Sequence, residues 1–439
     1  MRALAVVLGV AVLARLGAVL WLADTIPYTD YFYYHEAGRL QAEDWQFFFR
    51  PETVTRYGKL NWWPPGYPMF LAAIYGLVGP DFRVAVFVQV VLGTAVCALV
   101  FATASRAAGR GVGLAAALLV AVNPTYVFTT NLLASENLFA LWLAMAMEFT
   151  CRARRALAAQ GPGGTPAAHR KRWAVLAGGV YALATLTRAV GLPLVLVAAA
   201  WVRQGASPRR AGNLTAVWLL AGFAVVLAPW TLRNAVVARS PALVCFGGGL
   251  NFYFGNNDAP PGYRELGQTE LSGIGDPAAI DRAGWRLGLR HLAAHPLDFP
   301  IRGLEKLGSL FASPIHALHA NSAILIPDPK AQPELADEAA AKRARQAAKD
   351  RLLHGPLAFV AALHSYLLLA AAALACILGW RRLPDAMRLA AWICIAWLVV
   401  HFVFWAQPRF RYPIEIPMAL LAGWAVVCRF VDRHRGAVT

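Results

Sequence analysis

The sequence predicts an all-α, multi-pass membrane protein, and three features of the chain support this fold class. Hydrophobic residues make up 58% of the 439 residues and charged residues only 15%, and the mean hydropathy is +0.49. A water-soluble globular protein carries a larger share of charged residues. In addition, apolar segments long enough to cross a hydrocarbon layer of roughly 30 Å recur along the chain. These observations exclude a soluble enzyme.

About ten segments have the length and hydropathy of a transmembrane helix, which takes about 20 apolar residues. The first segment follows Arg2, as a signal peptide would, but its apolar run is long, it contains Arg15, and no small-residue cleavage site precedes Asp24. We therefore expect an uncleaved anchor. The segments lie near residues 3–23, 84–104, 112–130, 132–149, 173–187, 189–202, 213–230, 356–379, 387–405 and 412–430.

The basic residues predict the orientation, because short loops rich in Lys and Arg stay in the cytoplasm. Every second loop is basic, so both termini are expected inside, and the dispersed net charge of +17 indicates topology and argues against a nucleic-acid partner. The six cysteines lack metal-ligand spacing and are expected to pack within the protein. The basic loop residues are Arg106, Arg110, Arg152, Arg154, Arg155, Arg170, Lys171, Arg172, Arg203, Arg209, Arg210, Arg381, Arg382, Arg429, Arg433 and Arg435.

This topology predicts one transmembrane domain at residues 1–430 with two long extracytoplasmic loops, at residues 24–83 and 231–355, and a cytoplasmic tail at residues 431–439. The first loop contains Pro64-Pro65, followed by an apolar run that ends at Gly79. That run is too short to span the bilayer comfortably, so an interfacial or re-entrant helix is expected there. A charged stretch at residues 334–351 of the second loop is expected to be a solvated helix.

Polar and charged side chains gather at the predicted extracytoplasmic ends of the spans. Charges at membrane depth are costly unless they are paired or lie in a polar cavity, so several on one side form a candidate functional site. For any single arginine, the alternative is a side chain that only reaches toward the headgroups. The set consists of Asp30, His35, Glu36, Glu136, Arg188, Arg233, Asn234, Arg409 and Arg411.

The order of the short motifs along the chain resembles that of the GT-C membrane glycosyltransferases, most closely the branch with the protein O-mannosyltransferases and the lipid A aminoarabinose transferase. The resemblance extends over nearly the whole chain. It implies an enzyme that takes a sugar from a polyprenyl-phosphate carrier. The matching motifs are Asp30, Trp63-Pro-Pro-Gly-Tyr-Pro68, Ser135-Glu136, Leu186-Thr-Arg188, Pro229-Trp-Thr-Leu-Arg-Asn234, Gly247-Gly-Gly-Leu-Asn-Phe-Tyr-Phe-Gly-Asn256 and Arg409-Phe-Arg-Tyr-Pro413.

The resemblance places Asp30 at the family's first-loop catalytic carboxylate, and Glu136 is expected to take part in catalysis. The mannosyltransferases have an Asp-Glu pair where this chain has Asp30-Tyr31, so acceptor type and metal use are not carried over. The reaction needs a base for the acceptor and cations for the leaving phosphate. Candidate phosphate ligands are Arg188, Arg233, Lys306, Arg409 and Arg411, and candidate pocket residues are Tyr34, Trp63, Tyr67, Asn234 and Asn256.

His35, Glu36 and Glu136 offer oxygen and imidazole ligands that could hold a divalent metal, although an interfacial hydrogen-bond network is an equal interpretation of His35. The expected partners are a lipid-linked sugar donor, an acceptor outside the cytoplasm and the bilayer, and the expected location is a bacterial-type inner membrane. No Gly-x-Gly-x-x-Gly turn or Asp-x-Asp pair supports a nucleotide-sugar enzyme. The alternative is a transporter or lipid flippase, which would place its charges near the bilayer midplane.

Overall fold

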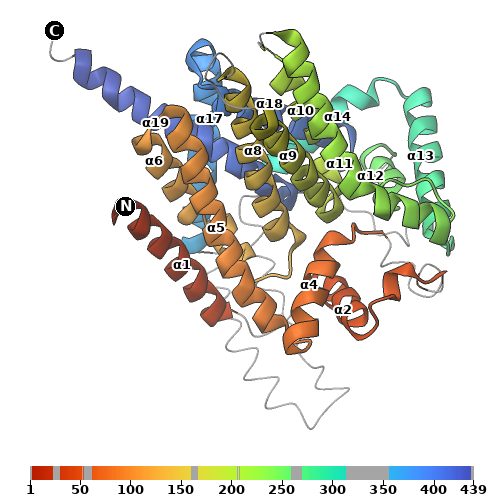
Figure 1. Ribbon diagram of the computed structural model, residues 1–439. Helices are drawn as coiled ribbons and strands as arrows, with labels where there is room; N and C mark the ends of the chain where they lie inside the picture. Colours follow the sequence, from red (N-terminus) through yellow and green to blue (C-terminus); the bar gives the residue numbers. More distant parts are fainter. Residues whose placement is uncertain are drawn as a thin grey trace.

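We describe the protein from a computed structural model (Figure 1). The structure describes residues 2–22, 30–51, 53, 62–159, 167–204, 206, 208–258, 269–312 and 355–436, with side chains as far as residue 428. Within these ranges the regular elements are helices. The predicted charged stretch at residues 334–351 lies outside the described residues. The described part of the chain therefore agrees with the predicted all-α class.

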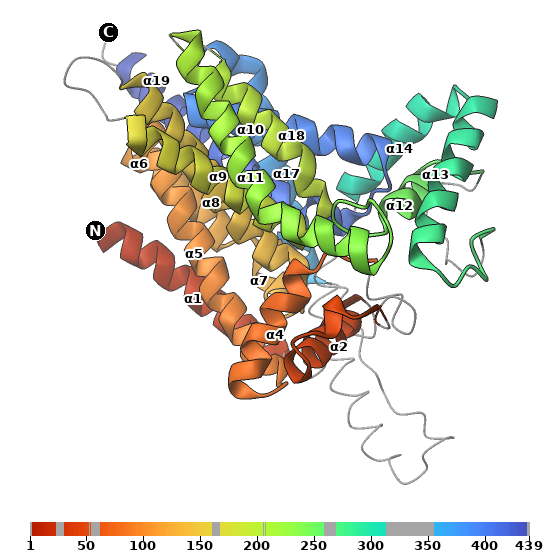
Figure 2. The ribbon, with the colours of Figure 1, turned by 45° about the vertical axis from the view of Figure 1, so that its right-hand side comes forward.

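Most helices form a single bundle, seen from two directions in Figures 1 and 2. Each of the ten predicted segments is largely helical in the structure. The bundle contains α1 (Arg2–Leu22), α5 (Phe82–Ala108), α6 (Arg110–Ala121), α7 (Pro124–Thr129), α8 (Ser135–Ala158), α9 (Ala167–Thr187), α10 (Leu192–Arg203), α11 (Arg209–Val237), α17 (Pro356–Gly379), α18 (Asp385–Val403) and α19 (Glu415–Gly436).

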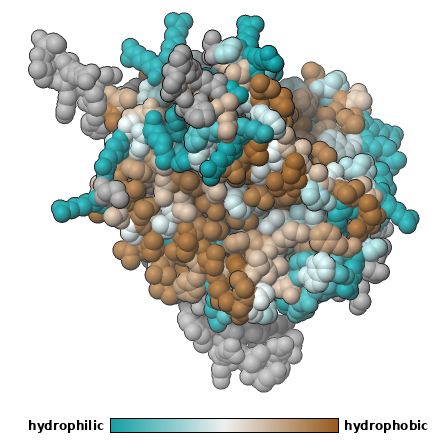
Figure 3. All heavy atoms as spheres, in the orientation of Figure 1, coloured by the Kyte–Doolittle hydropathy of each residue, from teal (hydrophilic) through white to brown (hydrophobic). Residues whose placement is uncertain are grey.

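Five of the described helices are long and apolar enough to cross a membrane, namely α1, α5, α11, α18 and the helix at Pro356–Arg382. The protein is thus a multi-pass membrane protein, but the expected total of about ten spans is not confirmed by this criterion. Helices α6 and α10 are shorter, and α8 and α9 include several charged side chains. Apolar side chains dominate the middle of the surface in Figure 3, and Leu13 and Leu20 on α1 are each 70% exposed, as lipid-facing residues would be.

The predicted span at residues 112–130 is two helices, because Pro124 lacks the N–H that would continue α6. Asn123 caps α7 by accepting a hydrogen bond from the Thr125 N–H at 2.9 Å. Arg15, fully buried on α1, donates to the carbonyl oxygens of Val120 and Ala121, both at 3.2 Å. Arg15, one of the reasons to expect an uncleaved anchor, therefore supplies hydrogen-bond donors to the free carbonyl groups at the C-terminus of α6.

The first long loop contributes α2 (Asp30–Glu43), the short helix η1 (Phe47–Phe49) and α4 (Gly66–Val78). Helix α4 is the short helix expected after Pro64-Pro65, and it ends at Gly79, whose φ of 86° favours glycine. Helix α2 packs closely on α4, since a Cβ added at Gly38 would lie 2.7 Å from Leu71 Cβ. Figures 1 and 2 show α2 and α4 together at one end of the bundle.

The second long loop contributes α12 (Gly248–Gly255), α13 (Pro277–Ala294) and α14 (Asp298–Ala312), which lie beside the bundle in Figure 2. Close backbone contact joins α12 to α13, because a Cβ at Gly249 would lie 1.9 Å from the Asp281 carbonyl oxygen. Asp281 also accepts a hydrogen bond from the Gly249 N–H at 2.7 Å. Helix α14 packs against α18 and against η7 (Pro408–Ile414), so the second loop borders the Arg409 segment.

A buried carboxylate organises the basic part of the bundle. Glu148, in the middle of α8, is within 2.5 Å of Arg106 and 2.6 Å of Arg152, and it accepts a hydrogen bond from Thr103 at 2.9 Å. Glu148 lies twelve residues after Glu136 on the same helix, which corresponds to about 18 Å. The loop arginines used to predict topology thus neutralise an acid well separated from the Glu136 end of α8.

Candidate functional site

Four of the predicted site residues form two ion pairs. Asp30, the first residue of α2, pairs with Arg409 of η7 across 379 positions of sequence. Glu136, in the first turn of α8, pairs with Arg188 just after α9, with Glu136 Oε1 and Arg188 Nη1 2.8 Å apart. Each acid lies at a helix N-terminus, where the helix dipole favours a negative charge. The structure therefore brings together the residues that the sequence placed in four separate segments.

Phe410 joins the two pairs. Its ring centroid is 5.4 Å from Cζ of Arg188 and 5.2 Å from Cζ of Arg409, so both guanidinium groups contact one aromatic ring. The Nε atoms of both arginines are buried and make no hydrogen bond to a described residue. Two neighbouring cations with unused donors are suited to the oxygen atoms of a phosphate group.

Aromatic residues of the first loop lie on one side of the Glu136–Arg188 pair, next to Ser135. The Tyr34 hydroxyl is 3.3 Å from Ser135 Oγ, which accepts a hydrogen bond from Arg188 Nη1 at 3.0 Å. The Tyr34 ring packs edge-on against Trp63, at 5.9 Å, and Tyr67, at 5.1 Å. The three predicted pocket residues of the first loop therefore lie together beside the ion pair.

The electrostatics of α2 link both ion pairs. Burial raises the pKa of the Tyr31 phenol, the nearby acids Glu136 and Asp30 raise it further, and Arg409 opposes this change. The pKa of Tyr34 is also raised, mainly by burial and then by Asp30. Both hydroxyls consequently stay protonated at neutral pH and can donate hydrogen bonds.

A buried amide network, which the sequence did not reveal, holds these elements in place. Gln89 Oε1 accepts hydrogen bonds from the Tyr67 hydroxyl at 2.8 Å and from Asn137 Nδ2 at 3.0 Å. The Tyr412 hydroxyl donates to Asn137 Oδ1 at 2.8 Å. The network joins α4, α5, α8 and η7. Gln89 stands alone in an apolar run, and that isolation is the signal that could have identified it.

A second cationic position lies where α14 meets the end of α18. Lys306 is buried, and its Nζ donates to the Val403 carbonyl oxygen at 3.2 Å and to Asn256 Oδ1 at 3.4 Å. Burial and, to a smaller extent, the charge of Arg302 lower the pKa of Lys306 to about 8. Two predicted residues, Lys306 and Asn256, are thus in contact.

The other predicted cations are engaged elsewhere. Arg411 Nε is 3.0 Å from Glu415 Oε1, and both side chains are almost fully buried within the bundle. Arg233 donates to the Phe48 carbonyl oxygen at 2.6 Å and to Asn234 Oδ1 at 3.0 Å, which ties η1 to α11. In the structure these residues hold elements together and do not join the two ion pairs.

The residues expected to bind a metal do not converge. His35 Nδ1 is 2.8 Å from the Tyr75 hydroxyl, and Glu36 pairs with Arg39 at 3.0 Å. Glu136 is held by Arg188, so each of the three expected ligands has a different partner. This corrects the expected grouping and agrees with the hydrogen-bond interpretation of His35.

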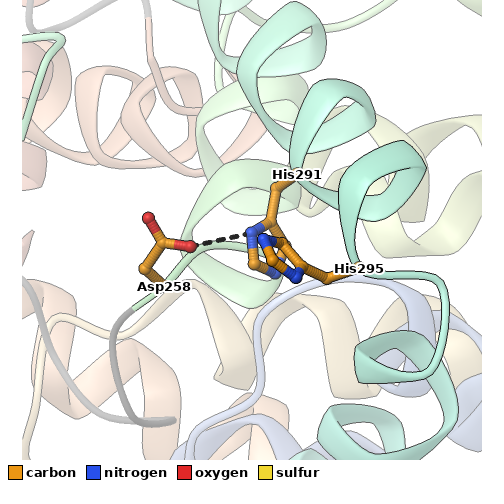
Figure 4. A group of neighbouring side chains, drawn as sticks. All are labelled: Asp258, His291 and His295. Carbon is orange, nitrogen blue, oxygen red and sulfur yellow. Dashed lines mark ion pairs between the residues drawn. The ribbon is translucent and has the colours of Figure 1, made fainter.

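Among the described residues, the side chains that do gather as metal ligands would are Asp258, His291 and His295 (Figure 4). This group was not predicted. His291 and His295 are four residues apart, a spacing that places two side chains on one face of a helix. Asp258 lies more than thirty positions earlier in the sequence, so the spacing of the histidines alone could have revealed only part of the cluster.

Fold and site together define a helical membrane protein with paired charges at one end of its bundle, and comparisons with known proteins place it more closely. The family described as dolichyl-phosphate-mannose-protein mannosyltransferase matches residues 63–232. No curated protein sequence matches the chain. The expected resemblance to the GT-C membrane glycosyltransferases is confirmed by this family match and by the fold of the archaeal oligosaccharyltransferase described next.

The oligosaccharyltransferase of Archaeoglobus fulgidus, solved with zinc and sulfate, shares the fold with a TM-score of 0.56 at 16% identity, over 98% of this chain and 49% of that one. The oligosaccharyltransferase AglB from the same organism, in complex with an inhibitory peptide and a dolichol-phosphate, gives a TM-score of 0.53 at 15% identity, over 100% of this chain and 51% of that one. ArnT from Cupriavidus metallidurans bound to undecaprenyl phosphate gives 0.44 at 15%, over 97% and 77%. The chain thus spans about half the length of the archaeal enzyme.

Proposed function

We propose that this protein is a membrane glycosyltransferase that moves a sugar from a polyprenyl-phosphate carrier to a lipid, polysaccharide or protein acceptor. The observation that carries the proposal is the meeting of the Asp30–Arg409 and Glu136–Arg188 ion pairs at Phe410. A carboxylate beside two partly free guanidinium groups supplies both a base and a phosphate site. The family match over residues 63–232 supports the same reaction class.

In the proposed reaction, Asp30 accepts the proton of the acceptor hydroxyl while the acceptor oxygen attacks the anomeric carbon of the sugar. The bond between that carbon and the phosphate oxygen breaks, and the polyprenyl phosphate leaves with the electron pair. Arg188 and Arg409 stabilise the charge that develops on the leaving phosphate. Arg409 would turn from Asp30 toward the phosphate as the donor binds, which frees the carboxylate to act as a base.

Glu136 has a positioning role in this proposal. Its carboxylate and Ser135 Oγ both contact Nη1 of Arg188, at 2.8 Å and 3.0 Å. These contacts direct the guanidinium, whose buried Nε has no hydrogen-bond partner among the described residues. Lys306 offers a further cation for the phosphate side, in contact with Asn256 and close to the end of α18.

We further propose that the site faces the extracytoplasmic side of a bacterial-type inner membrane, within one transmembrane domain at residues 1–430. The first loop at residues 24–83 and the second at residues 231–355 would then enclose the donor sugar. One observation supports this orientation. Three of the arginines predicted to be cytoplasmic, Arg106, Arg152 and Arg155, lie around Glu148, about 18 Å along α8 from Glu136.

The test is to follow lipid-linked sugars in membranes of cells that lack this chain and to restore the gene as wild type or as Asp30→Asn. The wild type should remove the accumulated donor and release polyprenyl phosphate. Asp30→Asn should be expressed and inserted but inactive, because the amide keeps the size of the side chain and loses its basicity. Normal turnover by Asp30→Asn would contradict the role of Asp30.

The same assay separates the enzyme from a transporter or lipid flippase. A transporter would carry the lipid-linked sugar across the bilayer unchanged and would release no polyprenyl phosphate. Protein reconstituted in sealed vesicles that moves the intact donor without cleaving it would therefore refute the enzyme. In the structure, the two ion pairs lie at helix ends, which favours interface chemistry over a binding site at mid-membrane.

A further inference from the structure

We propose that Asp258, His291 and His295 form a binding site for a divalent transition metal ion of the zinc type, separate from the two ion pairs. One potential ligand atom from each residue lies within 4.8 Å of the others. In Figure 4 the Asp258 carboxylate points toward the two imidazole rings, which come from α13 and from the residue that follows it. The centroids of the two rings are 5.2 Å apart.

The surroundings of His291 point to a cation at this position. Its Nδ1 is 3.0 Å from Asp258 Oδ1, and its Nε2 is 3.1 Å from Asp298 Oδ2. A neutral imidazole has a single N–H, so one ring nitrogen would face a carboxylate with a lone pair. The side chain is only 8% exposed, and Nε2 is buried without a well-aligned hydrogen bond to a described residue.

A metal ion on Nδ1 of His291 removes this conflict. The ion would take the lone pair of Nδ1 and the charge of Asp258, and the proton would reside on Nε2, facing Asp298. A carboxylate on the second nitrogen of a metal-bound histidine is a common arrangement that sets the tautomer and the ring orientation. Arg302 Nε lies 3.6 Å from Asp298 Oδ2 and would hold that carboxylate in place.

The ligand types indicate which ion would bind. Two imidazole nitrogens and one carboxylate oxygen suit zinc and neighbouring transition metals, whereas calcium and magnesium favour sites made of oxygen atoms alone. Asp258 and His295 are exposed. The remaining coordination positions would therefore be open to water, and a chelator could remove the ion.

Such an ion would connect three parts of the second loop. Asp258 follows α12, His291 lies on α13, and His295 begins the turn into α14. Asn256, two residues before Asp258, contacts Lys306 of α14. The ion would thus hold the end of α12 against the α13–α14 turn and would help to maintain the hydrogen bond between Lys306 and Asn256. The site rests on its own geometry and would stand if the proposed sugar transfer were disproved.

The test uses the full-length protein, purified in detergent and stripped with a chelator. We expect Zn²⁺ to bind with one equivalent per chain in calorimetry, Co²⁺ to give visible d–d absorption, and Zn²⁺ to raise the melting temperature of the wild type. His295→Ala and Asp258→Asn change exposed side chains, so these variants should fold. Each should weaken Zn²⁺ binding at least about tenfold and abolish the increase in melting temperature.

Two controls make the outcome decisive. His169→Ala changes an exposed histidine on α9 and should bind Zn²⁺ as the wild type does. His35→Ala changes the first-loop residue and should also leave binding intact. Absence of saturable binding to the wild type would show that His291 only contacts the two carboxylates, and the proposal would fail. It would fail equally if His295→Ala bound normally or if His35→Ala removed the metal.

Discussion

The replacement of Arg188 by lysine tests whether a guanidinium group, rather than positive charge alone, holds the donor phosphate. Arg188 uses Nη1 for Glu136 Oε1, at 2.8 Å, and for Ser135 Oγ, at 3.0 Å, which leaves Nε unused. A lysine ammonium can keep the ion pair with Glu136, but it lacks the planar fork that reaches a second acceptor. Arg188→Lys should therefore lose the phosphate contact while the local charge is preserved.

The expected magnitude follows from one lost charge-assisted hydrogen bond, which contributes about 1.5–3 kcal/mol. Since each 1.36 kcal/mol corresponds to a factor of ten in rate, kcat/KM for the lipid-linked donor should fall by about ten- to a hundredfold. If the contact forms equally in the ground and transition states, the change will appear in KM. If it forms only as the phosphate leaves, the change will appear in kcat.

The assay measures polyprenyl phosphate released from a lipid-linked sugar by purified protein in detergent. Arg239→Lys is the matched control, because Arg239 is exposed in a loop and has the same side chain. Its kcat/KM should equal that of the wild type. A kcat/KM for the lipid-linked donor that is normal in Arg188→Lys and reduced in Arg239→Lys would refute the role of Arg188 as a phosphate ligand.

Phe410→Leu should lower kcat/KM about two- to thirtyfold, because leucine fills the space but removes a ring whose cation–π contacts contribute about 0.5–2 kcal/mol. Unchanged kinetics would show that the ring does not orient the arginines. Gly93→Ala should lower the melting temperature measurably, since the added Cβ would lie 2.4 Å from Arg15 Nε and overpacking costs about 1–3 kcal/mol. Gly9→Ala, which meets nothing within 4 Å, is the control, and equal melting temperatures would contradict the prediction. The pKa of Lys306 is lowered to about 8, so its positive charge is present below pH 8 and lost above it. Donor binding should therefore weaken as the pH rises through that value. In Lys306→Arg the side chain stays charged, so donor binding should no longer weaken in this pH range.

The sequence alone determined the class of the protein and the places of most of its helices. Apolar runs predict membrane spans because a helix that crosses the hydrocarbon layer must be long and must carry little charge. Each segment has to meet this requirement by itself, so it can be recognised in the sequence. The short helix after Pro64-Pro65 could be predicted for the same local reason. The break at Pro124 was missed, because a proline in an apolar run can either kink a helix or end it, and the choice depends on partners such as Arg15 and Glu415.

Only the tertiary structure decided which charged residues form the site. Asp30 and Arg409 pair across 379 positions, and no local pattern encodes such a contact. Arg409 and Arg411 looked equivalent in the sequence, but with about three residues per turn of a 3-10 helix their side chains point in different directions, one toward Asp30 and the other into the bundle toward Glu415. The proposed metal ligands differ from the ligands expected from the sequence for the same reason. Helix packing brings Asp258 to His291, whereas the sequence neighbours His35 and Glu36 each contact a different partner.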